Sequence, residues 1–532
     1  MTDIAGAPSM SSVVPSDLSA ETLRDWMDRN AATTADRAAY VGPEGTLTYR
    51  LLHARAAAVA SGLRALGLSK GDVVAAQLPN GIEFILTYLA AGYIGAVLQT
   101  IHMPYRAAEI EPMLRHGKAK AVVCLSRTKD FAPAELVLSL RQRLPDLAAV
   151  VAVGPGAPPE AVPFAALEGT ETEPPVGRPR ASDRFLLLYT SGTTAAPKGV
   201  PVSYDKFLAN ARLSAPELGI DGNSILLSAA PFTHLYGLFS INLALAAGAC
   251  TAVLPVFTPA SLADALDSWR PTGLFVAPAH MAACLNEGLL APERLSSLGF
   301  ILVSGSACPP EFARTLQDRL PGGKICQLWG MSELQAGAFT RPDDAENVRL
   351  ATAGRASPGT ELRVADGATP LPAHAEGELQ ARGISMFEGY LDNPQATADA
   401  FTADGWFRTG DLARMDEGGN VGITGRLKEI INRGGVKFNP ADVEAVIGLH
   451  PAVTSCAIVP MPDPVLGERA CCFVVPRSGA GIGLDEIRTW LGRHDIAKTK
   501  WPERIEIIDE MPMTPTRKIR KSELAKLVAD VR

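Results

Sequence analysis

The stretch Tyr189-Thr-Ser-Gly-Thr-Thr-Ala-Ala-Pro-Lys-Gly-Val200 is the most informative part of this sequence. It follows the apolar run Phe185–Leu188, so we predict a loop at the end of a strand. Hydroxyl groups, the backbone N–H groups of small residues and the ammonium of Lys198 together suit a polyphosphate. A polar surface turn is the alternative interpretation of the same composition. The loop is not a Walker A motif, because Pro197-Lys198-Gly199 stands where that motif requires Gly-Lys-Ser/Thr.

Length and composition indicate a globular protein of several units. The chain has 532 residues, of which 47% are hydrophobic and 20% charged, with a formal net charge of −7. This length predicts about three or four units, and the acidic balance argues against a broad nucleic-acid surface. The eight cysteines are scattered without a Cys-x-x-Cys pair or a Cys/His cluster, which favours reduced thiols and a cytoplasmic location over disulfides or a metal centre. Residues 1–15 lack the basic start and apolar run of a secretory signal.

One segment is long and apolar enough to raise the question of a membrane span. Residues 222–263 contain no Asp, Glu, Lys or Arg. Pro231, Gly237, Gly248 and Pro255 interrupt the run, and Lys/Arg flanks are missing. We therefore predict a buried strand–helix–strand unit and no membrane span.

Hydrophobic periodicity predicts an α/β fold. In the first half, helices are expected at residues 52–66, 82–91 and 107–116, and strands at residues 73–78, 95–100 and 120–124. Such alternation is typical of parallel sheets covered by helices. Residues 154–180 are predicted to form an exposed connection, and a second α/β stretch is predicted from 185 to 337. Short strands at 361–365 and 377–381 indicate a smaller β-rich subdomain that extends to residue 424.

The pattern changes after residue 424. Helices are predicted at residues 441–449 and 484–491, and strands at 454–459, 470–475 and 504–508. This predicts a compact α+β domain at the C-terminal end.

Further segments combine chemistry-bearing residues, although each has an ordinary structural interpretation. Ser304-Gly-Ser306 could simply form a tight turn, and Asp411 could simply form an Asx turn. Residues 327–333 could simply combine a core tryptophan with a surface glutamate. A basic linker accounts for 425–437, and a solvated basic tail for 514–518. Function is therefore argued from the whole set. The segments are Val303-Ser-Gly-Ser-Ala307, Gln327-Leu-Trp-Gly-Met-Ser-Glu333, Trp406-Phe-Arg-Thr-Gly-Asp-Leu412, Gly425-Arg-Leu-Lys-Glu-Ile-Ile431, Asn432-Arg-Gly-Gly-Val-Lys437 and Thr514-Pro-Thr-Arg-Lys518.

Taken together and in this order, these segments resemble the adenylate-forming superfamily of acyl-CoA synthetases, adenylation domains and firefly-type luciferases. The resemblance runs from Leu47-Thr-Tyr-Arg50 to Lys521. It implies a large N-terminal domain, residues 1–424, of α/β subdomains plus a β-barrel-like subdomain. A small mobile α+β domain, residues 425–532, is implied to follow, with its hinge at Lys428. It also implies two half-reactions: a carboxylate and Mg-ATP give acyl-AMP and pyrophosphate, and a thiol, usually that of coenzyme A, then displaces AMP.

The resemblance implies a role for each matching residue. Lys518, Thr194 and Glu333 are expected to be catalytic, with Glu333 as the Mg²⁺ ligand. The phosphate loop is expected to bind the leaving pyrophosphate, Trp329 to stack on adenine, and Asp411 with Arg426 to bind the ribose. The expected ATP and AMP contacts are Thr190, Ser191, Gly192, Thr193, Thr194, Lys198, Ser304, Gly305, Ser306, Gln327, Leu328, Trp329, Gly330, Met331, Ser332, Asp411, Arg426 and Lys518. The expected acid pocket contains His234, Tyr236, Gly237, Val303, Gly330 and Gly337, and the expected coenzyme A tunnel contains Gly434 and Gly435.

Two positions depart from the family pattern, since Ala195 and Arg517 each replace a usual glycine. The pocket segments are apolar, and residues 222–263 offer no carboxylate to hold an α-ammonium group, so a hydrophobic acid is favoured over an amino acid. Gly330 and Gly337 are expected to leave room for a ring or a medium chain.

The expected function is an acid–CoA ligase whose partners are a small carboxylic acid and coenzyme A. The alternative within the class is an aryl-acid adenylating enzyme that loads a carrier protein. A P-loop kinase is excluded by the missing Walker lysine context. A catalytically silent binding protein is disfavoured by the presence of Lys518, Glu333 and Asp411.

Overall fold

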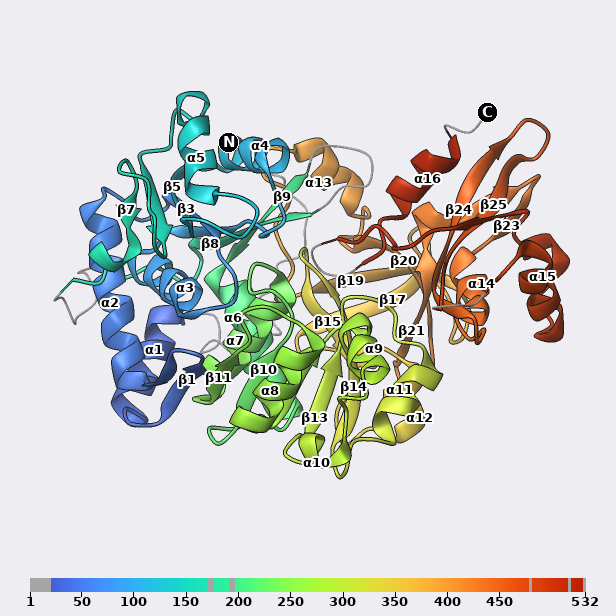
Figure 1. The fold of residues 1–532 in the computed structure, drawn as a ribbon, viewed down its shortest axis with the longest axis horizontal. Coiled ribbons are helices and arrows are strands. Elements are labelled where there is room, and N and C mark those ends of the chain that lie inside the picture. The colour runs from blue at the N-terminus through green and yellow to red at the C-terminus, as the bar shows by residue number, and fades with distance from the viewer. Residues whose placement is uncertain (1–20, 170–176, 191–196, 478–480, 515–517, 530–532) are drawn as a thin grey trace. The chain divides into compact units, whose positions relative to one another are not determined.

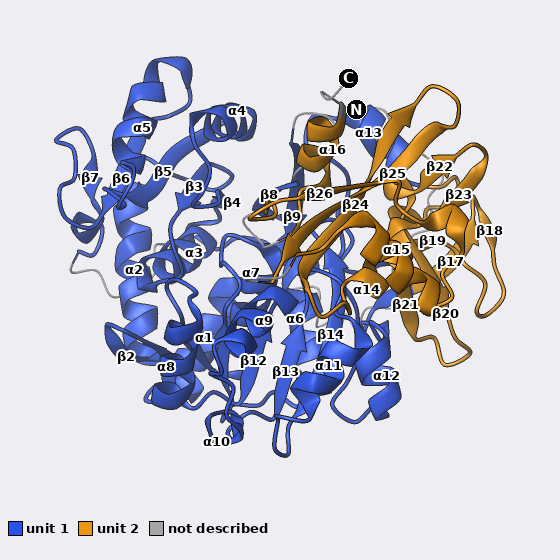
Figure 2. Cartoon of the chain, turned by 45° about the vertical axis from the view of Figure 1, so that its right-hand side comes forward, with its two compact units in different colours: residues 1–361, 382–401 blue, residues 362–381, 402–532 orange. Residues whose placement is uncertain are grey.

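A computed structural model describes residues 21–169, 177–190, 197–477, 481–514 and 518–529 (Figure 1). Its contacts divide the chain into two compact units, coloured separately in Figure 2. Unit 1 comprises residues 1–361 and 382–401, and unit 2 comprises residues 362–381 and 402–532. Both mix helices and strands, which confirms the predicted α/β class with a large N-terminal and a small C-terminal part. The predicted boundary at residue 424 stays a prediction.

Unit 1 is built around two mixed sheets. The seven-stranded sheet contains, in spatial order, β7 (Val162–Pro163), β6 (Ala149–Val153), β5 (Ala119–Leu125), β3 (Val73–Gln77), β4 (Val97–Thr100), β8 (Arg184–Thr190) and β9 (Lys198–Ser203). The nine-stranded sheet contains β16 (Arg355–Ala356), β15 (Gln335–Phe339), β14 (Lys324–Met331), β13 (Phe300–Val303), β12 (Gly273–Val276), β10 (Ile225–Ser228), β11 (Cys250–Val253), β1 (Ala38–Gly42) and β2 (Gly45–Thr48). Their central strands are parallel, so the loops at the carboxyl ends of each sheet share one edge, where α/β proteins place ligands.

Helices cover these sheets as the alternating pattern predicts. For example, α5 packs on β5 and β6, and α7 packs on β10 and β11. The helices of unit 1 are α1 (Leu23–Thr33), α2 (Tyr49–Ala65), α3 (Ile82–Ile94), α4 (Ala107–Gly117), α5 (Pro133–Leu140), α6 (Tyr204–Glu217), α7 (Leu235–Ala247), α8 (Pro259–Trp269), α9 (Pro278–Asn286), α10 (Pro292–Leu295), α11 (Pro310–Gln317), α12 (Glu346–Ala351) and α13 (Pro394–Ala400). The predicted helices at 52–66, 82–91 and 107–116 are therefore confirmed within a few residues.

The charge-free segment 222–263 forms the predicted strand–helix–strand unit, β10–α7–β11. Every residue of α7 from Leu235 to Leu245 is buried, because the helix also contacts α1, α6 and β15. Gly248 ends it in the left-handed conformation at φ 66°, which glycine adopts without strain. Within the described residues, no helix is long and apolar enough to cross a membrane.

Unit 2 contains two five-stranded sheets. One has the order β18 (Thr369–Pro370), β17 (Thr360–Asp366), β19 (Gly377–Gly383), β20 (Phe407–Met415) and β21 (Val421–Arg426), and it corresponds to the predicted β-rich subdomain. The other has β23 (Val436–Phe438), β22 (Ile431–Arg433), β25 (Gly467–Pro476) and β24 (Val453–Asp463), with β26 (Arg504–Ile507) paired to β25. Helices α14 (Pro440–Ile447), α15 (Leu484–Arg493) and α16 (Lys521–Ala529) accompany this second sheet. The predicted C-terminal α+β domain is confirmed.

Three local predictions were wrong or incomplete. The connection at 154–180 was predicted to be exposed, but β7 joins the sheet there, and Phe164 and Leu167 are buried. Asp411 was predicted in a turn, but it lies inside β20. The hairpin of β14 and β15 was not foreseen, because a single strand pattern with glycines at 330 and 337 carries weak periodicity.

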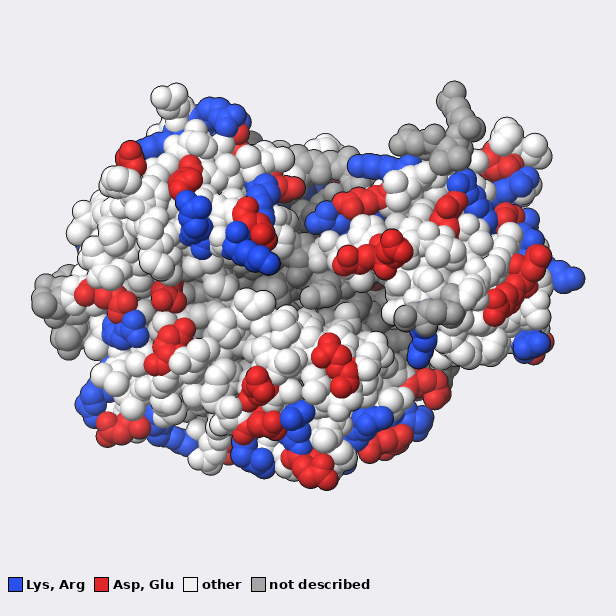
Figure 3. All heavy atoms as spheres, viewed as in Figure 1, with Lys and Arg blue, Asp and Glu red and all other residues white. Residues whose placement is uncertain are grey.

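Figure 3 shows the charged side chains on one face of the molecule. Among the described residues on that face, Lys and Arg side chains alternate with Asp and Glu, and no broad area carries one sign. All eight cysteines are free thiols, seven of them buried. Among the described residues, no group of three or more His, Cys, Asp or Glu side chains could hold a metal ion by itself.

Candidate active site

The phosphate loop connects two antiparallel strands. Thr190 at the end of β8 pairs with Lys198 at the start of β9, so the loop begins and ends at the same edge of the seven-stranded sheet. The predicted contacts Ser191, Gly192, Thr193 and Thr194, and the substituted position Ala195, lie outside the described residues. Lys198 is partly buried, and its Nζ lies 4.5 Å from the centroid of the Tyr390 ring. The ammonium is thus held against an aromatic face at the mouth of the loop.

The β14–β15 hairpin positions Glu333. Its turn follows Met331, and Glu333 is only 8% exposed. The hydroxyl of Tyr390 donates a hydrogen bond to Oε1 of Glu333 at 3.0 Å, and the N–H of Phe387 donates to its backbone carbonyl at 2.8 Å. Burial, and then the neighbouring Glu333 carboxylate, raise the pKa of Tyr390, so its hydroxyl remains a donor.

This carboxylate is compatible with the predicted magnesium ion. Mg²⁺ takes one or two protein carboxylates together with phosphate oxygens and water. Glu333 supplies a buried carboxylate that accepts a hydrogen bond from Tyr390, whose ring also lies against Lys198, so the donor set fits a metal bound mainly by a nucleotide. The described residues therefore fit Mg²⁺ as the companion of a polyphosphate.

The predicted adenine-binding residues end the central strands of the nine-stranded sheet. Ser304 follows β13, and its hydroxyl donates to the Leu328 carbonyl at 2.8 Å, while Gly305 has φ +93° and Ser306 is exposed. Trp329, in β14, is 9% exposed. The side chain of Gln327 donates to the carbonyls of Arg349 and Leu350, so it fixes the end of α12.

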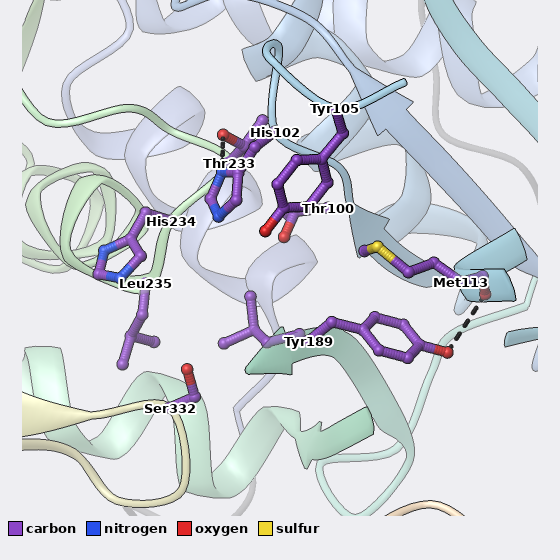
Figure 4. A pocket seen from close by; sticks show the side chains of 10 residues that line it. Thr100, His102, Tyr105, Met113, Tyr189, Thr233, His234, Leu235 and Ser332 are labelled. Atoms are coloured by element: carbon purple, nitrogen blue, oxygen red, sulfur yellow. Dashed lines mark hydrogen bonds between the residues drawn. The ribbon is translucent and has the colours of Figure 1, made fainter. Parts of the chain in front are cut away.

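A pocket lies where the carboxyl ends of β4 and β8 meet the start of α7 (Figure 4). His234 caps α7, since its Nδ1 accepts a hydrogen bond from the Tyr236 N–H at 3.2 Å. The centroids of the His102 and His234 rings are 6.2 Å apart, with their planes inclined by 27°. Nδ1 of His102 is 2.9 Å from the Thr233 hydroxyl. The lining residues are Thr100, His102, Tyr105, Met113, Leu188, Tyr189, Thr233, His234, Leu235 and Ser332. The surroundings of His234 are therefore more polar than the sequence predicted.

Several residues predicted for the acid pocket are closely packed, and their role in that pocket stays a prediction. A Cβ on Gly337 would come 2.5 Å from the Trp329 ring, and a Cβ on Gly330 would come 2.1 Å from the Gln335 carbonyl. The space directly beside these two glycines is thus occupied by the Trp329 ring and by the opposite strand. Tyr236 is buried and its hydroxyl donates to the Leu302 carbonyl at 2.6 Å, and a Cβ on Gly237 would meet the Pro231 carbonyl at 2.2 Å. Val303 is buried at the end of β13.

Burial of His102 predicts a stability that depends on pH. Desolvation lowers the pKa of its imidazole from 6.5 to about 4. Between these values the unfolded chain binds a proton that the folded chain does not, so stability falls as the pH drops from 7 to 4, by up to about 3 kcal/mol. Replacing His102 by Asn should remove this part of the loss. Urea unfolding of both proteins at pH 7 and pH 4.5 measures it, and equal losses in both would contradict the prediction.

Unit 2 holds the predicted ribose-binding pair. Asp411 in β20 lies opposite Arg426 in β21, and Nε of Arg426 is 3.0 Å from Oδ1 of Asp411. The Asp411 side chain is 6% exposed and that of Arg426 53% exposed. The arginine thus orients a buried carboxylate at the sheet edge.

The predicted hinge and tunnel residues follow in the chain. Lys428 lies in the short 3₁₀ turn Leu427–Glu429. Gly434 and Gly435 form the β22–β23 hairpin turn with φ of 58° and 92°. Two hydrogen bonds join Lys518 to Thr514: the Lys518 N–H donates to the Thr514 side-chain hydroxyl at 2.9 Å, and the Thr514 N–H donates to the Lys518 carbonyl at 2.7 Å. The substituted position Arg517 lies outside the described residues.

Two residues that line or support these sites were missed in the sequence. His102 follows β4, but nothing in its spacing indicates that it faces His234. Tyr390 lies 57 residues beyond Glu333, and only the tertiary structure brings the two together.

Comparison with known proteins agrees with this geometry. Residues 27–391 match the family model described as AMP-binding enzyme, and residues 442–518 match the AMP-binding enzyme C-terminal domain. The chain is 34% identical over 511 residues to a medium-chain fatty-acid–CoA ligase of Escherichia coli strain K12, covering 95% of this chain and 90% of that protein. It is 32% identical over 521 residues to a salicylyl-CoA synthase / salicylate adenylyltransferase of Streptomyces, covering 95% and 93%.

Solved structures give the same result. The crystal structure of ATP-bound MatB from Rhodopseudomonas palustris matches with a TM-score of 0.87 and 26% identity, covering 96% of this chain and all of that one. Because one family model spans most of the chain and relatives above 30% identity cover it almost completely, this protein belongs to the AMP-binding enzyme family, the adenylate-forming enzymes.

Proposed function

We propose that this AMP-forming enzyme is an acid–CoA ligase. It activates a hydrophobic carboxylic acid as acyl-AMP with release of pyrophosphate, and then transfers the acyl group to coenzyme A. The names of its relatives support this class, since one acts on medium-chain fatty acids and another on salicylate. The choice between an aliphatic and an aromatic acid is left to the experiment below.

The observation that carries the proposal is the convergence of Lys198 and Glu333 on Tyr390. A cation on the phosphate loop and a buried carboxylate are the two groups that a magnesium–polyphosphate needs, the first for phosphate oxygens and the second for the metal. Mg²⁺, when bound, neutralises charge on the phosphates. The enzyme's own part is to hold both groups oriented before the nucleotide arrives, so that they do not reorganise during the reaction.

In the first half-reaction, Lys198 and the loop from Thr190 hold the departing pyrophosphate, and Glu333 holds the metal side of the triphosphate. Lys518 contacts the attacking carboxylate and the α-phosphate, where negative charge accumulates. Asp411 accepts hydrogen bonds from the ribose hydroxyls, and Arg426 keeps its carboxylate oriented. Trp329 and the residues around Gly305 take the adenine. In the second half-reaction, the C-terminal domain turns at Lys428, and the thiol of coenzyme A enters beside Gly434 and Gly435.

The acid is proposed to be a hydrophobic monocarboxylate. The segment from β10 to α8 carries no Asp or Glu before residue 264, so it offers no partner for the ammonium of an α-amino acid. A buried ammonium without a partner costs several kcal/mol. His234 is positioned at the start of α7 to meet the carboxylate end, since its Nδ1 is fixed by the Tyr236 N–H.

A panel of carboxylic acids tests the proposal. Pyrophosphate release is measured with Mg-ATP and each acid, with and without coenzyme A, and the thioester is detected by mass. We expect octanoate-like or benzoate-like acids to support release and to give a coenzyme A thioester, and amino acids to give neither. Release that ignores coenzyme A, together with loading of a purified aryl carrier protein, would favour the second function, aryl-acid activation for a carrier. The carrier-protein assay is included because one relative is named a salicylate adenylyltransferase.

The hairpin turn at Gly435 gives a test of the coenzyme A tunnel. A Cβ built there meets no atom within 4 Å, so a side chain has space, although φ of 92° strains any residue but glycine. Gly435→Trp should stop thioester formation while acyl-AMP formation continues. Gly435→Ala carries the same backbone strain with little bulk and should retain most thioester formation. Stopped-flow pyrophosphate release and thioester yield measure the two steps, and equal loss in both variants would contradict a tunnel at this turn.

A further inference from the structure

We propose that Tyr390 is a positioning residue that sets the geometry between Glu333 and Lys198, and through them the affinity for a divalent metal–ATP complex. The inference rests on the proposed roles of those two residues. It concerns a residue that neither the motifs nor the spacing of the sequence indicated.

Tyr390 contacts both Glu333 and Lys198. Its hydroxyl donates to the Glu333 carboxylate at 3.0 Å, and its ring lies beneath the Lys198 ammonium at 4.5 Å from the centroid. A phenol is suited to this double task because its hydroxyl fixes an anion while its face attracts a cation. Within the described part of the chain, Lys198 forms no ion pair, so its charge is available to phosphate.

The backbone of the same segment holds both strands. The Phe387 N–H donates to the Glu333 carbonyl at 2.8 Å, and the Leu391 N–H donates to the Gly199 carbonyl at 2.9 Å. The Phe387 ring packs edge-on against the Tyr390 ring at 4.9 Å. Residues 387–391 therefore connect the start of β9 to the β14–β15 turn, although these belong to different sheets. Backbone hydrogen bonds therefore hold the segment of Tyr390 on both sides of that residue.

The hydroxyl has one direct consequence for metal binding. A carboxylate that accepts a hydrogen bond from a neutral phenol keeps its charge but loses rotational freedom, so an ion that binds it loses less entropy. A hydrogen bond to a charged group is among the stronger kinds. Removing the hydroxyl should therefore weaken metal binding with the nucleotide more than it weakens binding of the acid.

The test separates the two contacts with two variants. Tyr390→Phe removes the hydroxyl and keeps the ring, and Tyr390→Leu removes both. Tyr40→Phe is the control, because Tyr40, in β1 and outside the site, also donates a hydrogen bond to a glutamate, Glu44. Tyr40 is buried and Tyr390 is partly buried. Binding of Mn²⁺ to the enzyme–ATP complex is measured by electron paramagnetic resonance, and the Mg²⁺ concentration for half-maximal pyrophosphate release is measured with the best acid.

We expect Tyr390→Phe to weaken Mn²⁺ binding by about tenfold and to raise the Mg²⁺ requirement equally, with the KM of the acid unchanged. Tyr390→Leu should in addition weaken ATP binding about threefold, through Lys198. In a Glu333→Gln background, Tyr390→Phe should add little, since the two changes remove one interaction. Tyr40→Phe should leave Mn²⁺ binding unaltered.

Unchanged Mn²⁺ binding in Tyr390→Phe would overturn the inference and leave the proposed function intact. The same holds if the losses of Mn²⁺ binding caused by Tyr390→Phe and Glu333→Gln add in full in the double variant. A wild-type enzyme that binds no Mn²⁺–ATP would overturn both. A fall in unfolding stability of Tyr390→Phe that matches that of Tyr40→Phe, without a change in metal binding, would assign Tyr390 a structural role only and so reject the inference.

Discussion

Replacing Lys518 by Ala should reduce acyl-AMP formation by two to three orders of magnitude, equivalent to about 3–4 kcal/mol of transition-state stabilisation. The loss follows from removing a cation at the point where the carboxylate and the α-phosphate meet, since no neutral side chain offsets the charge that develops there. Thioester formation from supplied acyl-AMP and coenzyme A should continue, because that step does not use this ammonium. Single-turnover assays of each half-reaction measure the two effects separately.

Lys526→Ala provides the control for that experiment. Lys526 is an exposed lysine on α16, eight positions beyond Lys518 in the chain. Its removal changes the net charge by the same amount and should leave both half-reactions near the wild-type rate. An equal loss of both half-reactions in Lys518→Ala would contradict the assignment, because it would indicate damage to the fold of the C-terminal domain.

The second large effect concerns stability and the ion cluster around Lys521. Its ammonium lies 2.8 Å from carboxylate oxygens of both Glu429 and Glu444. Burial lowers the pKa of Lys521, but the two carboxylates outweigh it and raise that pKa above its ordinary value. Lys521→Met would leave two partly buried carboxylates without their cation. The expected loss of unfolding free energy is about 2–3 kcal/mol, between the values for exposed and fully buried pairs. Denaturant unfolding monitored by circular dichroism measures the loss.

Two further variants show whether the stability loss in Lys521→Met comes from the lost charge and from its burial. Lys521→Arg keeps the charge and should retain much of the stability. Lys500→Met removes a lysine whose partner, Asp442, is 3.3 Å away on a half-exposed surface, and should cost no more than about 1 kcal/mol. Equal destabilisation by Lys521→Met and Lys500→Met would show that burial of the cluster adds nothing. Because Glu429 adjoins Lys428, the cluster also ties the start of α16 to the proposed hinge.

Local patterns in the sequence predicted the elements well where one physical signal dominated. The helices at 52–66 and 82–91 were found because apolar residues recur with helical spacing, and the segment 222–263 was interpreted correctly because proline and glycine interrupt its apolar run. The β14–β15 hairpin and β7 were missed, because short strands with glycine or proline carry little periodicity and depend on their neighbours.

The candidate site shows the same limit more sharply. Ordered motifs identified Lys198, Glu333 and Asp411, since their residue types reveal their chemistry without knowledge of the fold. The space directly beside Gly337 is occupied by Trp329, because the backbone pairing of β14 and β15 turns that ring inward. The polar pocket around His102 and His234 also escaped prediction, as it joins the ends of strands from two sheets.

The sequence by itself therefore determined the family, the α/β class and the identity of the charged groups, since these depend on composition, periodicity and motif order along the chain. Only the tertiary structure decided which groups share one environment. Tyr390 contacts both Lys198 and Glu333 because residues 387–391 connect two sheets, and Lys521 meets Glu429 and Glu444 because α16 returns to the turn at 427–429. Such contacts depend on packing between distant segments, and local sequence patterns do not encode them.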